Sequence, residues 1–229
     1  MKAIVLCGGL GTRLGHLTSD TPKPILEVAG RPFLSYVLEQ LSSAPVDEII
    51  LSVGFQSKKI ENIFGDYWGH IPLSYSVEDK PLGTGGAIKK AMQTKGIEEA
   101  LVMNGDTLLK IDPDVVWNYA RKENADIAMT LKFCEDASRF GVVRVNSKNQ
   151  VDGFEEKRSG ASGPINTGLY YIKKSVFSLS KKEIFSFEED ILSLGYKNLK
   201  IVGMMTDAYF IDMGVPEDFS RAQTELLGQ

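Results

Sequence analysis

The residues whose types and spacing could support chemistry begin near the amino terminus, directly after the apolar run at 3–6. The sequence GGLGTR at 8–13 supplies glycines, which let backbone N–H groups approach an anion, and the guanidinium of Arg13, which matches phosphate oxygens. Lys23 follows between two prolines, which hold its backbone in a rigid segment. A turn without a ligand would explain the glycines alone, but the added cations favour a polyphosphate-binding loop.

Two common nucleotide-binding motifs do not fit this loop. The dinucleotide fingerprint G-x-G-x-x-G fails because Leu14 stands where its last glycine should be. The P-loop pattern G-x-x-x-x-G-K-[ST] has no match here either. The loop is therefore expected to hold phosphates in its own way.

Two aspartates far apart in the sequence each stand at the expected end of a strand. Asp106 closes the apolar run 100–103, and Asp212 follows alternating apolar residues and precedes Gly214. In an open α/β sheet, strand ends are where ligands bind, although an aspartate can also simply stabilise a turn. Two carboxylates that converge on a polyphosphate suit Mg²⁺, which takes one or two carboxylates together with phosphate oxygens.

A set of short motifs resembles the signatures of the sugar-phosphate nucleotidylyltransferases. These motifs are GGLGTRL, TPKP, LGTGGA, NGD, FEEK, NTG and FIDMGVPEDF, and they extend over nearly the whole chain. The chain looks most similar to the short bacterial guanylyltransferases of D-glycero-D-manno-heptose 1-phosphate. Guanylyltransferases of mannose 1-phosphate and uridylyltransferases of N-acetylmuramate 1-phosphate are similar relatives. The resemblance implies transfer of a nucleoside monophosphate from an NTP to a sugar 1-phosphate, with release of pyrophosphate.

The resemblance also implies site residues. The implied catalytic residues are Arg13, Lys23, Asp106 and Asp212. The implied ligands of Mg²⁺ are Asp106 and Asp212. The implied nucleotide site comprises Leu6, Cys7, Gly8, Gly9, Gly11, Thr12, Arg13, Glu78, Gly83, Thr84 and Asp106. The implied sugar-phosphate site comprises Gly141, Glu156, Lys157, Asn166 and Thr167.

Within the sugar-phosphate site, Glu156 would bind sugar hydroxyls and Lys157 the phosphate, although a solvated charge cluster is the plain alternative. The heptose relatives commonly show glycine at the position of Thr167, which leaves the sugar open.

The resemblance implies that the region of the second glycine cluster at 83–86 lines the base pocket, which makes Glu78 the candidate reader of the base, although a plain tight turn would explain these glycines alone. A carboxylate can accept hydrogen bonds from N1–H and N2–H₂ of guanine, whereas uracil presents one donor between two acceptors. Glu78 therefore favours GTP. Uridylyltransferase relatives can also carry Glu here, so UTP stays open.

The proposed reaction needs no general base, because a sugar 1-phosphate has a second pKa near ~6 and is already a nucleophile at neutral pH. It needs alignment with the α-phosphate and neutralisation of charge. The sequence offers no Ser-His-Asp or Cys-His set. Cys7 is expected to be a small buried thiol.

The order of predicted elements indicates a doubly wound, mainly parallel, Rossmann-like α/β sheet. Helices are predicted in the first half at 32–43, 57–64 and 84–93. Strands are predicted there at 48–54, 71–77 and 100–103. The second half is predicted to be a mixed or antiparallel extension for the sugar, with strands at 126–133, 140–145, 151–155 and 165–172. Helices are predicted at 186–194, where Ser186 and Glu189 form a capping-box pattern, and at 216–227.

The 229 residues are expected to form a single domain without a β-helix, with a nucleotide-binding half at about 1–125 and a sugar-phosphate-binding half at about 126–229. The net charge of −4 gives no basic field for nucleic acid. No apolar run approaches the ~20 residues of a membrane span. The two cysteines and the lack of a signal-peptide pattern predict a cytoplasmic protein, and a homo-oligomer is possible.

Two other classes compete. A non-catalytic, nucleotide-sugar-binding regulatory subunit would be expected to have lost Arg13, Lys23, Asp106 or Asp212, and all four are present. A glycosyltransferase would show an Asp-x-Asp metal motif, a spacing that 112–114 has. Because Pro113 suits the first turn of a helix, we interpret this triplet as a helix start.

Overall fold

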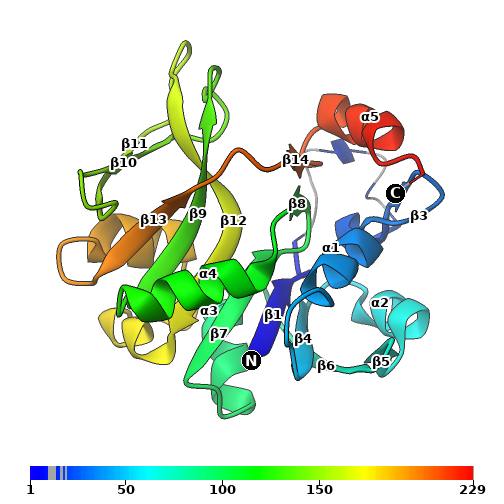
Figure 1. The fold of residues 1–229 in the computed structure, drawn as a ribbon. Coiled ribbons are helices and arrows are strands. Elements are labelled where there is room, and N and C mark those ends of the chain that lie inside the picture. Colours follow the sequence, from blue (N-terminus) through cyan, green and yellow to red (C-terminus); the bar gives the residue numbers. More distant parts are fainter. Residues whose placement is uncertain (10–13, 16–17, 19, 229) are drawn as a thin grey trace.

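A computed structural model describes residues 1–9, 14–15, 18 and 20–228 of the chain. Its centre is an eight-stranded sheet with the order β13-β9-β12-β7-β1-β4-β6-β5 (Figure 1). The strands β1 (Lys2–Leu6), β4 (Glu48–Val53), β6 (Ile71–Val77) and β7 (Glu99–Asn104) run parallel to one another. This confirms the predicted parallel core of the first half.

The second half continues the same sheet with mixed strand directions, as predicted. The long strand β12 (Gly163–Lys173) is antiparallel both to β7 and to β9 (Ile127–Cys134). The strand β13 (Ile201–Met205), which the sequence analysis did not predict, is parallel to β9 and forms the edge. The hairpin of β10 (Val142–Val145) and β11 (Val151–Glu155) lies beside this half, and Gln150 at its tip forms a bridge to Val202 of β13 (Figure 1).

Helices cover both faces of the sheet, because its central strands are apolar on both sides. In β1, Ala3 and Val5 pack into one core cluster and Ile4 into the other. The first cluster includes residues of α1 (Phe33–Leu41), α2 (Ser57–Phe64), α4 (Pro113–Lys122) and α5 (Pro216–Glu225). The second cluster includes residues of α3 (Gly83–Thr94), the 3₁₀ segment η3 (Lys174–Leu179) and η4 (Phe187–Ser193). This arrangement is the doubly wound fold that the sequence predicted.

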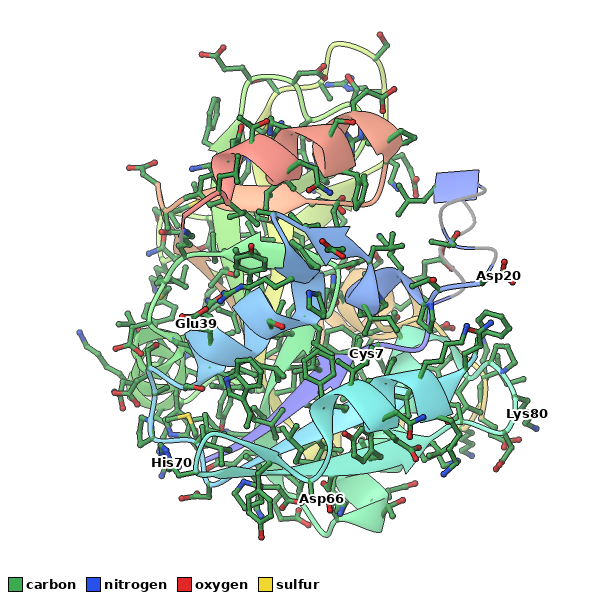
Figure 2. The ribbon with its side chains drawn as sticks, turned by 90° about the vertical axis from the view of Figure 1, so that its right-hand side faces the viewer. Cys7, Asp20, Glu39, Asp66, His70 and Lys80 are labelled. Atoms are coloured by element: carbon green, nitrogen blue, oxygen red, sulfur yellow. The ribbon has the colours of Figure 1, made fainter. Side chains whose placement is uncertain are left out.

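The remaining elements are short. They are η2 (Lys23–Ile25), β2 (Glu27–Val28), β3 (Arg31–Pro32), β5 (Tyr67–Trp68), β8 (Thr107–Leu109) and β14 (Phe210–Asp212). Figure 2 shows Cys7 inside the molecule, whereas Asp66, His70 and Lys80 lie at its periphery. In the part of the chain that the structure describes, no helix is long and apolar enough to cross a membrane.

Side-chain capping hydrogen bonds are present at both predicted helix starts, Asp112 and Ser186. The Asp112 carboxylate accepts a hydrogen bond from the N–H of Asp114 at 2.9 Å, which confirms that the Asp-x-Asp triplet begins a helix. At the second start, the Ser186 hydroxyl accepts from the N–H of Glu189 at 3.2 Å, as the capping box requires. The Ser186 N–H donates the reciprocal bond to the Asp190 carboxylate at 2.9 Å, and not to Glu189. The structure explains this correction, because η4 is a π-helix whose wider turn moves the facing residue one position on.

Candidate functional site

The glycine loop begins where β1 ends, between the carboxyl ends of its two neighbours. The N–H of Cys7 donates to the carbonyl of Ser52 at 2.7 Å, and the N–H of Gly105 donates to the carbonyl of Leu6 at 2.9 Å. These bonds fix Leu6, Cys7 and Gly8 at the carboxyl edge of the sheet, where α/β proteins bind ligands. Three predicted nucleotide-binding residues, Gly11, Thr12 and Arg13, lie outside the described residues.

Glu78 lies directly against this loop. A Cβ atom added to Gly8 would be 2.7 Å from Glu78 Oε1, so only glycine allows this approach without a shift. The Glu78 carboxylate accepts from the N–H of Leu82 at 3.0 Å and from the Ser52 hydroxyl at 3.5 Å. Burial raises the pKa of Glu78 despite these bonds. The predicted base reader is therefore beside the predicted phosphate loop.

Lys23 and Asp106 form an ion pair between residues far apart in the sequence. Lys23 lies on η2, and its side chain is only 7% exposed, whereas the Asp106 side chain is 32% exposed. A buried ammonium needs a partner, and Asp106 supplies one at the end of β7. The structure thus brings together two residues that the sequence predicted to be catalytic.

Asp212 reaches the same place through a pair of short strands. The strand β14 pairs with β8 in antiparallel fashion, so that Asp212 stands opposite Thr107, the neighbour of Asp106. The N–H of Met213 donates to the carbonyl of Asp106 at 3.1 Å, and the N–H of Gly214 donates to Asp212 Oδ1 at 2.7 Å. The structure thus places the backbones of the two aspartates side by side, whereas their role as metal ligands stays a prediction.

This donor set fits Mg²⁺ better than a metal held wholly by protein. Asp106 and Asp212 offer hard carboxylate oxygens at neighbouring positions. Among the described residues, no group of three or more His, Cys, Asp or Glu residues is arranged to hold a metal. A cation bound between the two aspartates would take further ligands from phosphates and water.

The second glycine cluster has a structural role that the sequence did not reveal. A Cβ atom on Gly83 would lie 2.5 Å from the carbonyl oxygen of Phe185, and one on Gly86 would lie 2.5 Å from that of Glu183. The N–H of Gly85 donates to the Phe185 carbonyl at 3.1 Å. The glycines therefore allow α3 to contact the segment 183–187. The predicted nucleotide contacts of Gly83 and Thr84 stay predictions.

On the sugar side, the structure places Gly141 beside Lys157. Gly141 has φ of +76°, so the strand predicted at 140–145 begins only after this residue. A Cβ atom at Gly141 would lie 3.9 Å from Lys157 Cγ. Glu156 and Lys157 are exposed. The Asn166 side chain donates to the Tyr170 hydroxyl at 2.6 Å and accepts from the N–H of Gly168 at 3.0 Å.

Thr167 differs from the other sugar-site candidates, because it is only 1% exposed. Its hydroxyl donates to the carbonyl of Thr130 at 3.1 Å. A contact between Thr167 and a sugar would therefore involve its backbone. Cys7 is also buried, and burial raises the pKa of its thiol, which supports the prediction of a packing thiol over a catalytic one.

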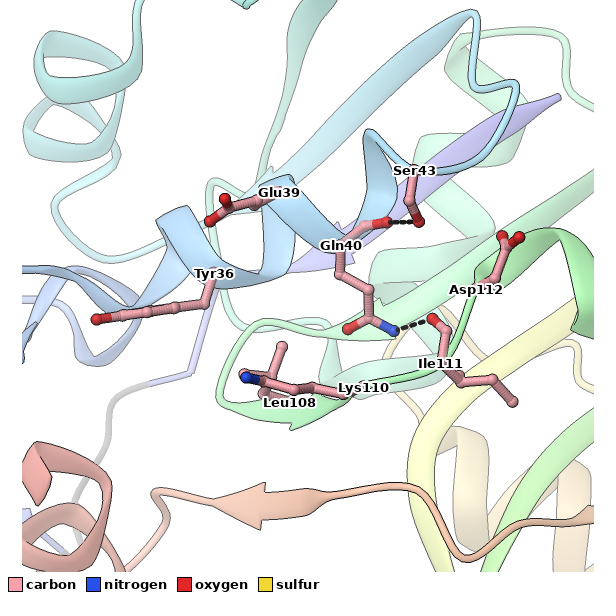
Figure 3. Close-up of a pocket in the computed structure, with 8 residues that line it drawn as sticks. All are labelled: Tyr36, Glu39, Gln40, Ser43, Leu108, Lys110, Ile111 and Asp112. Atoms are coloured by element: carbon pink, nitrogen blue, oxygen red, sulfur yellow. Dashed lines mark hydrogen bonds between the residues drawn. The ribbon is translucent and has the colours of Figure 1, made fainter. Parts of the chain in front are cut away.

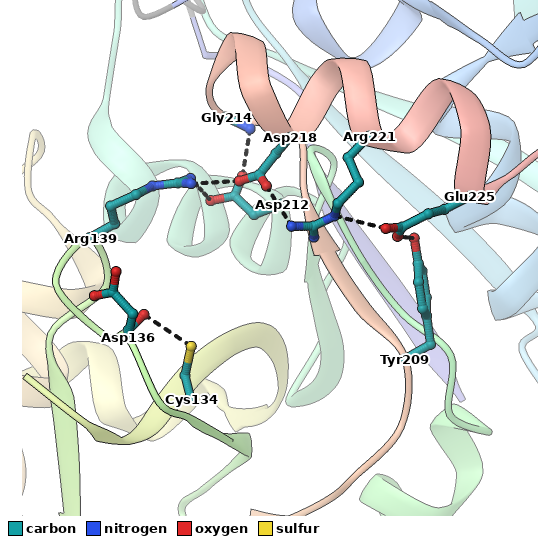
Figure 4. Close-up of polar contacts among 9 residues, drawn as sticks. All are labelled: Cys134, Asp136, Arg139, Tyr209, Asp212, Gly214, Asp218, Arg221 and Glu225. Atoms are coloured by element: carbon teal, nitrogen blue, oxygen red, sulfur yellow. Dashed lines mark hydrogen bonds and ion pairs between the residues drawn. The ribbon is translucent and has the colours of Figure 1, made fainter.

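Sequence reasoning missed an ionic network within the second half, which connects the segment before β10 with the end of β14 and with α5 (Figure 4). Arg139, two positions before Gly141 in the sequence, lies with Nη1 2.6 Å from Asp218 Oδ2 and with Nη2 3.9 Å from Asp212 Oδ2. Asp218 also contacts Arg221 at 2.9 Å. The loop that carries Gly141 is thus tied to α5 and to a predicted metal ligand. Arg139 precedes the conspicuous Phe140-Gly141 pair, which was the only signal in the sequence.

A surface hollow of about 420 Å³ lies between α1 and the connection from β8 to α4 (Figure 3). It contains none of the predicted site residues. Its lining residues are Tyr36, Glu39, Gln40, Ser43, Leu108, Lys110, Ile111 and Asp112. The hollow is therefore separate from the strand-end site.

A glycine loop, a buried lysine and paired aspartates at the carboxyl edge of a doubly wound sheet define an enzyme that handles nucleotide phosphates. Residues 2–229 match the family model described as Nucleotidyl transferase, and the chain belongs to this family.

Curated relatives cover the chain almost completely. The chain is 41% identical over 229 residues to the D-glycero-alpha-D-manno-heptose 1-phosphate guanylyltransferase of Aneurinibacillus thermoaerophilus, with 99% of this chain and 98% of that protein covered. It is 34% identical to the mannose-1-phosphate guanylyltransferase of Mycobacterium tuberculosis, over 99% of this chain and 65% of that protein. The resemblance inferred from the motifs is confirmed.

A solved structure shows the same fold. HddC from Yersinia pseudotuberculosis is 32% identical and superposes with a TM-score of 0.87, covering 98% of this chain and 99% of that one. A second structure of HddC, complexed with GMP-PN, gives a TM-score of 0.86 at 32% identity, with the same shares covered.

Proposed function

We propose that this protein transfers GMP from GTP to D-glycero-D-manno-heptose 1-phosphate, giving a GDP-sugar and pyrophosphate. The main support is full-length similarity at 41% identity to two heptose 1-phosphate guanylyltransferases, from Aneurinibacillus thermoaerophilus and Campylobacter jejuni. The complex of HddC with GMP-PN also supports guanine as the base. The ion pair of Lys23 with Asp106, beside Asp212, supports an enzyme over a non-catalytic subunit, which would not need these residues together.

In this reaction, an oxygen of the sugar phosphate forms a bond to the α-phosphorus of GTP, and the bond from that phosphorus to the bridging oxygen of pyrophosphate breaks. Arg13 and Lys23 would neutralise the triphosphate, and the glycine loop would hold it. Asp106 and Asp212 would hold Mg²⁺, which neutralises phosphate charge when bound. Lys157 would bind the sugar phosphate, and Glu156 and Asn166 the sugar hydroxyls.

Base selection would rest on Glu78, whose carboxylate lies beside the glycine loop. Guanine offers it two adjacent donors, whereas adenine would present an acceptor at N1. A charged hydrogen bond is worth about 1.5–3 kcal/mol, enough to separate GTP from ATP.

A mannose 1-phosphate guanylyltransferase is the second candidate, because the relative from Mycobacterium tuberculosis is 34% identical. N-acetylmuramate 1-phosphate with UTP is the remaining alternative from the sequence.

The proposal also includes a single domain over residues 1–229, made of a nucleotide half and a sugar half that meet near residue 125, and a cytoplasmic location.

The deciding experiment is a panel of GTP, UTP, dTTP and ATP against heptose, mannose and N-acetylmuramate 1-phosphates, with pyrophosphate release as the measurement. We expect the highest kcat/KM with GTP and the heptose phosphate. A higher value with UTP or dTTP would contradict the assignment of the base. If the protein binds GTP but does not release pyrophosphate with any of the sugar phosphates tested, it would be a regulatory subunit instead.

A further inference from the structure

The carboxylate of Glu188, which the sequence analysis did not use, connects the two halves at the candidate site. Glu188 Oε2 accepts a hydrogen bond from the Thr84 hydroxyl at 2.7 Å and another from the Ser186 hydroxyl at 3.2 Å. The Thr84 hydroxyl in turn accepts from the N–H of Phe187 at 2.9 Å. Thr84 belongs to the first turn of α3, on the nucleotide side. Glu188 is therefore fixed against the nucleotide half, although it lies late in the chain.

The surroundings of Glu188 also reach the sugar side. The ring of Phe187 packs edge-on against that of Tyr170, with centroids 5.3 Å apart. The hydroxyl of Tyr170 accepts from the Asn166 amide at 2.6 Å. Burial raises the pKa of Tyr170, and the charges of Glu188 and Asp106 both act on it in the same direction. Glu188 and the predicted metal ligand Asp106 are thus both close enough to influence one buried hydroxyl.

One oxygen of Glu188 has acceptor capacity for a ligand. Both hydrogen bonds to Glu188 from the described residues end on Oε2. A carboxylate has about four lone-pair positions and only accepts, so it suits hydroxyl groups and repels phosphate. Glu188 is also partly exposed, so that a ligand can reach it.

We infer that Glu188 is a specificity-determining residue that accepts hydrogen bonds from hydroxyl groups of the sugar. The inference rests on the proposed transfer to a sugar 1-phosphate. It places the hydroxyl-binding carboxylate between Thr84 on the nucleotide side and Asn166 on the sugar side. The phosphate of the sugar would then point away from Glu188.

The test compares Glu188→Gln with the wild type in steady-state assays of pyrophosphate release, with GTP and either heptose or mannose 1-phosphate. Glutamine keeps an acceptor oxygen for Thr84 and Ser186 but loses the charge and one acceptor. We expect the KM for the sugar phosphate to rise at least about tenfold (about 1.4 kcal/mol), while the KM for GTP stays within about twofold.

Two control variants separate this role from a structural one. Glu189→Gln changes the exposed neighbour and should leave both KM values unchanged. Ser186→Ala removes an internal hydrogen bond of Glu188 but keeps the carboxylate, so it should lower the melting temperature without a selective effect on the sugar. If Glu188→Gln fails to fold, Glu188→Asp, which withdraws the carboxylate by one methylene, should show the same selective rise.

Deoxy analogues of mannose 1-phosphate give the decisive comparison. The analogue that lacks the hydroxyl bound by Glu188 should give lower turnover with the wild type. With the Glu188→Gln variant, the same analogue should give no further loss of turnover. Equal changes in both KM values, or effects that match those of Ser186→Ala, would overturn the inference. Failure of the wild type with every substrate pair would instead overturn the proposed function.

Discussion

The ion pair of Lys23 and Asp106 leads to a prediction about the stability of the protein. The two partners differ in burial, since the Lys23 side chain is 7% exposed and that of Asp106 is 32% exposed. Removing one partner of a buried pair costs about 3–5 kcal/mol when it leaves a charge buried and unpaired. Asp106→Asn would leave the Lys23 ammonium buried and without its charged partner, so we expect the free energy of unfolding to fall by about 3 kcal/mol.

The reverse change should cost less. Lys23→Met leaves Asp106, which water can partly solvate, and the apolar side chain of methionine fills the buried space. The cost should therefore approach that of an exposed pair, about 1 kcal/mol. Urea unfolding of each variant in the presence of EDTA, followed by circular dichroism, measures both free energies.

The pair of Lys2 and Glu48 provides a control, because Lys2 is 41% exposed and Glu48, although 17% exposed, keeps the Lys95 ammonium 3.5 Å away as a second partner. Lys2→Met should cost at most about 1 kcal/mol. Equal losses for Lys23→Met and Asp106→Asn, or a larger loss for Lys23→Met, would refute the reasoning from unequal burial. Both site variants should lose turnover, so activity alone cannot make this distinction.

Four further predictions concern single residues. Arg13→Ala should cut turnover by at least about 10²-fold in a folded variant, as expected for one preorganised charge-stabilising group, and a change within about threefold would contradict its role. Lys157→Met should raise the KM for the sugar phosphate far more than that for GTP, and equal increases would make Lys157 a surface charge only. Because burial raises the pKa of Glu78, its carboxylate should protonate at a higher pH than that of an ordinary Glu, so GTP affinity should weaken as pH falls through that range. Glu78→Gln should lower kcat/KM for GTP, remove this pH dependence and reduce the difference in kcat/KM between GTP and UTP. Gly83→Ala should destabilise the protein by more than the roughly 1–3 kcal/mol of Gly65→Ala, because both have positive φ but only Gly83 would place its Cβ against a carbonyl oxygen, and urea unfolding compares the two.

The sequence was sufficient for the elements whose signal is local. The helix predicted at 57–64 is α2 at the same residues, and the strand predicted at 71–77 is β6. Asp106 and Asp212 were placed at strand ends because apolar residues precede each of them. The carboxyl edge of a parallel sheet then brings such residues together without further information.

Features that depend on contacts between distant segments could not be predicted. The glycines at 83–86 predicted a ligand turn, yet they also make room for the backbone of 183–187, which follows about 100 residues later. The reciprocal cap of Ser186 comes from Asp190 because η4 is a π-helix, which no local pattern indicated. The ion pairs of Arg139 likewise require the position of α5.

The candidate site also explains why the two chemical halves share one sheet. Asp106 follows a strand of the first half, whereas Asp212 lies near the end of the chain, and the pairing of β14 with β8 aligns them. Between β8 and β14 the chain passes through β9, β12 and the edge strand β13 before it returns to this place. Because β12 joins β7 directly to β9, the base of this site is continuous from the glycine loop to the sugar-side strands. Alignment of two reacting groups can lower a reaction barrier by about 7–11 kcal/mol, and small displacements of the groups remove this effect. A continuous sheet is the arrangement that would keep Lys23, Asp106 and Asp212 in register with the residues proposed to hold the sugar.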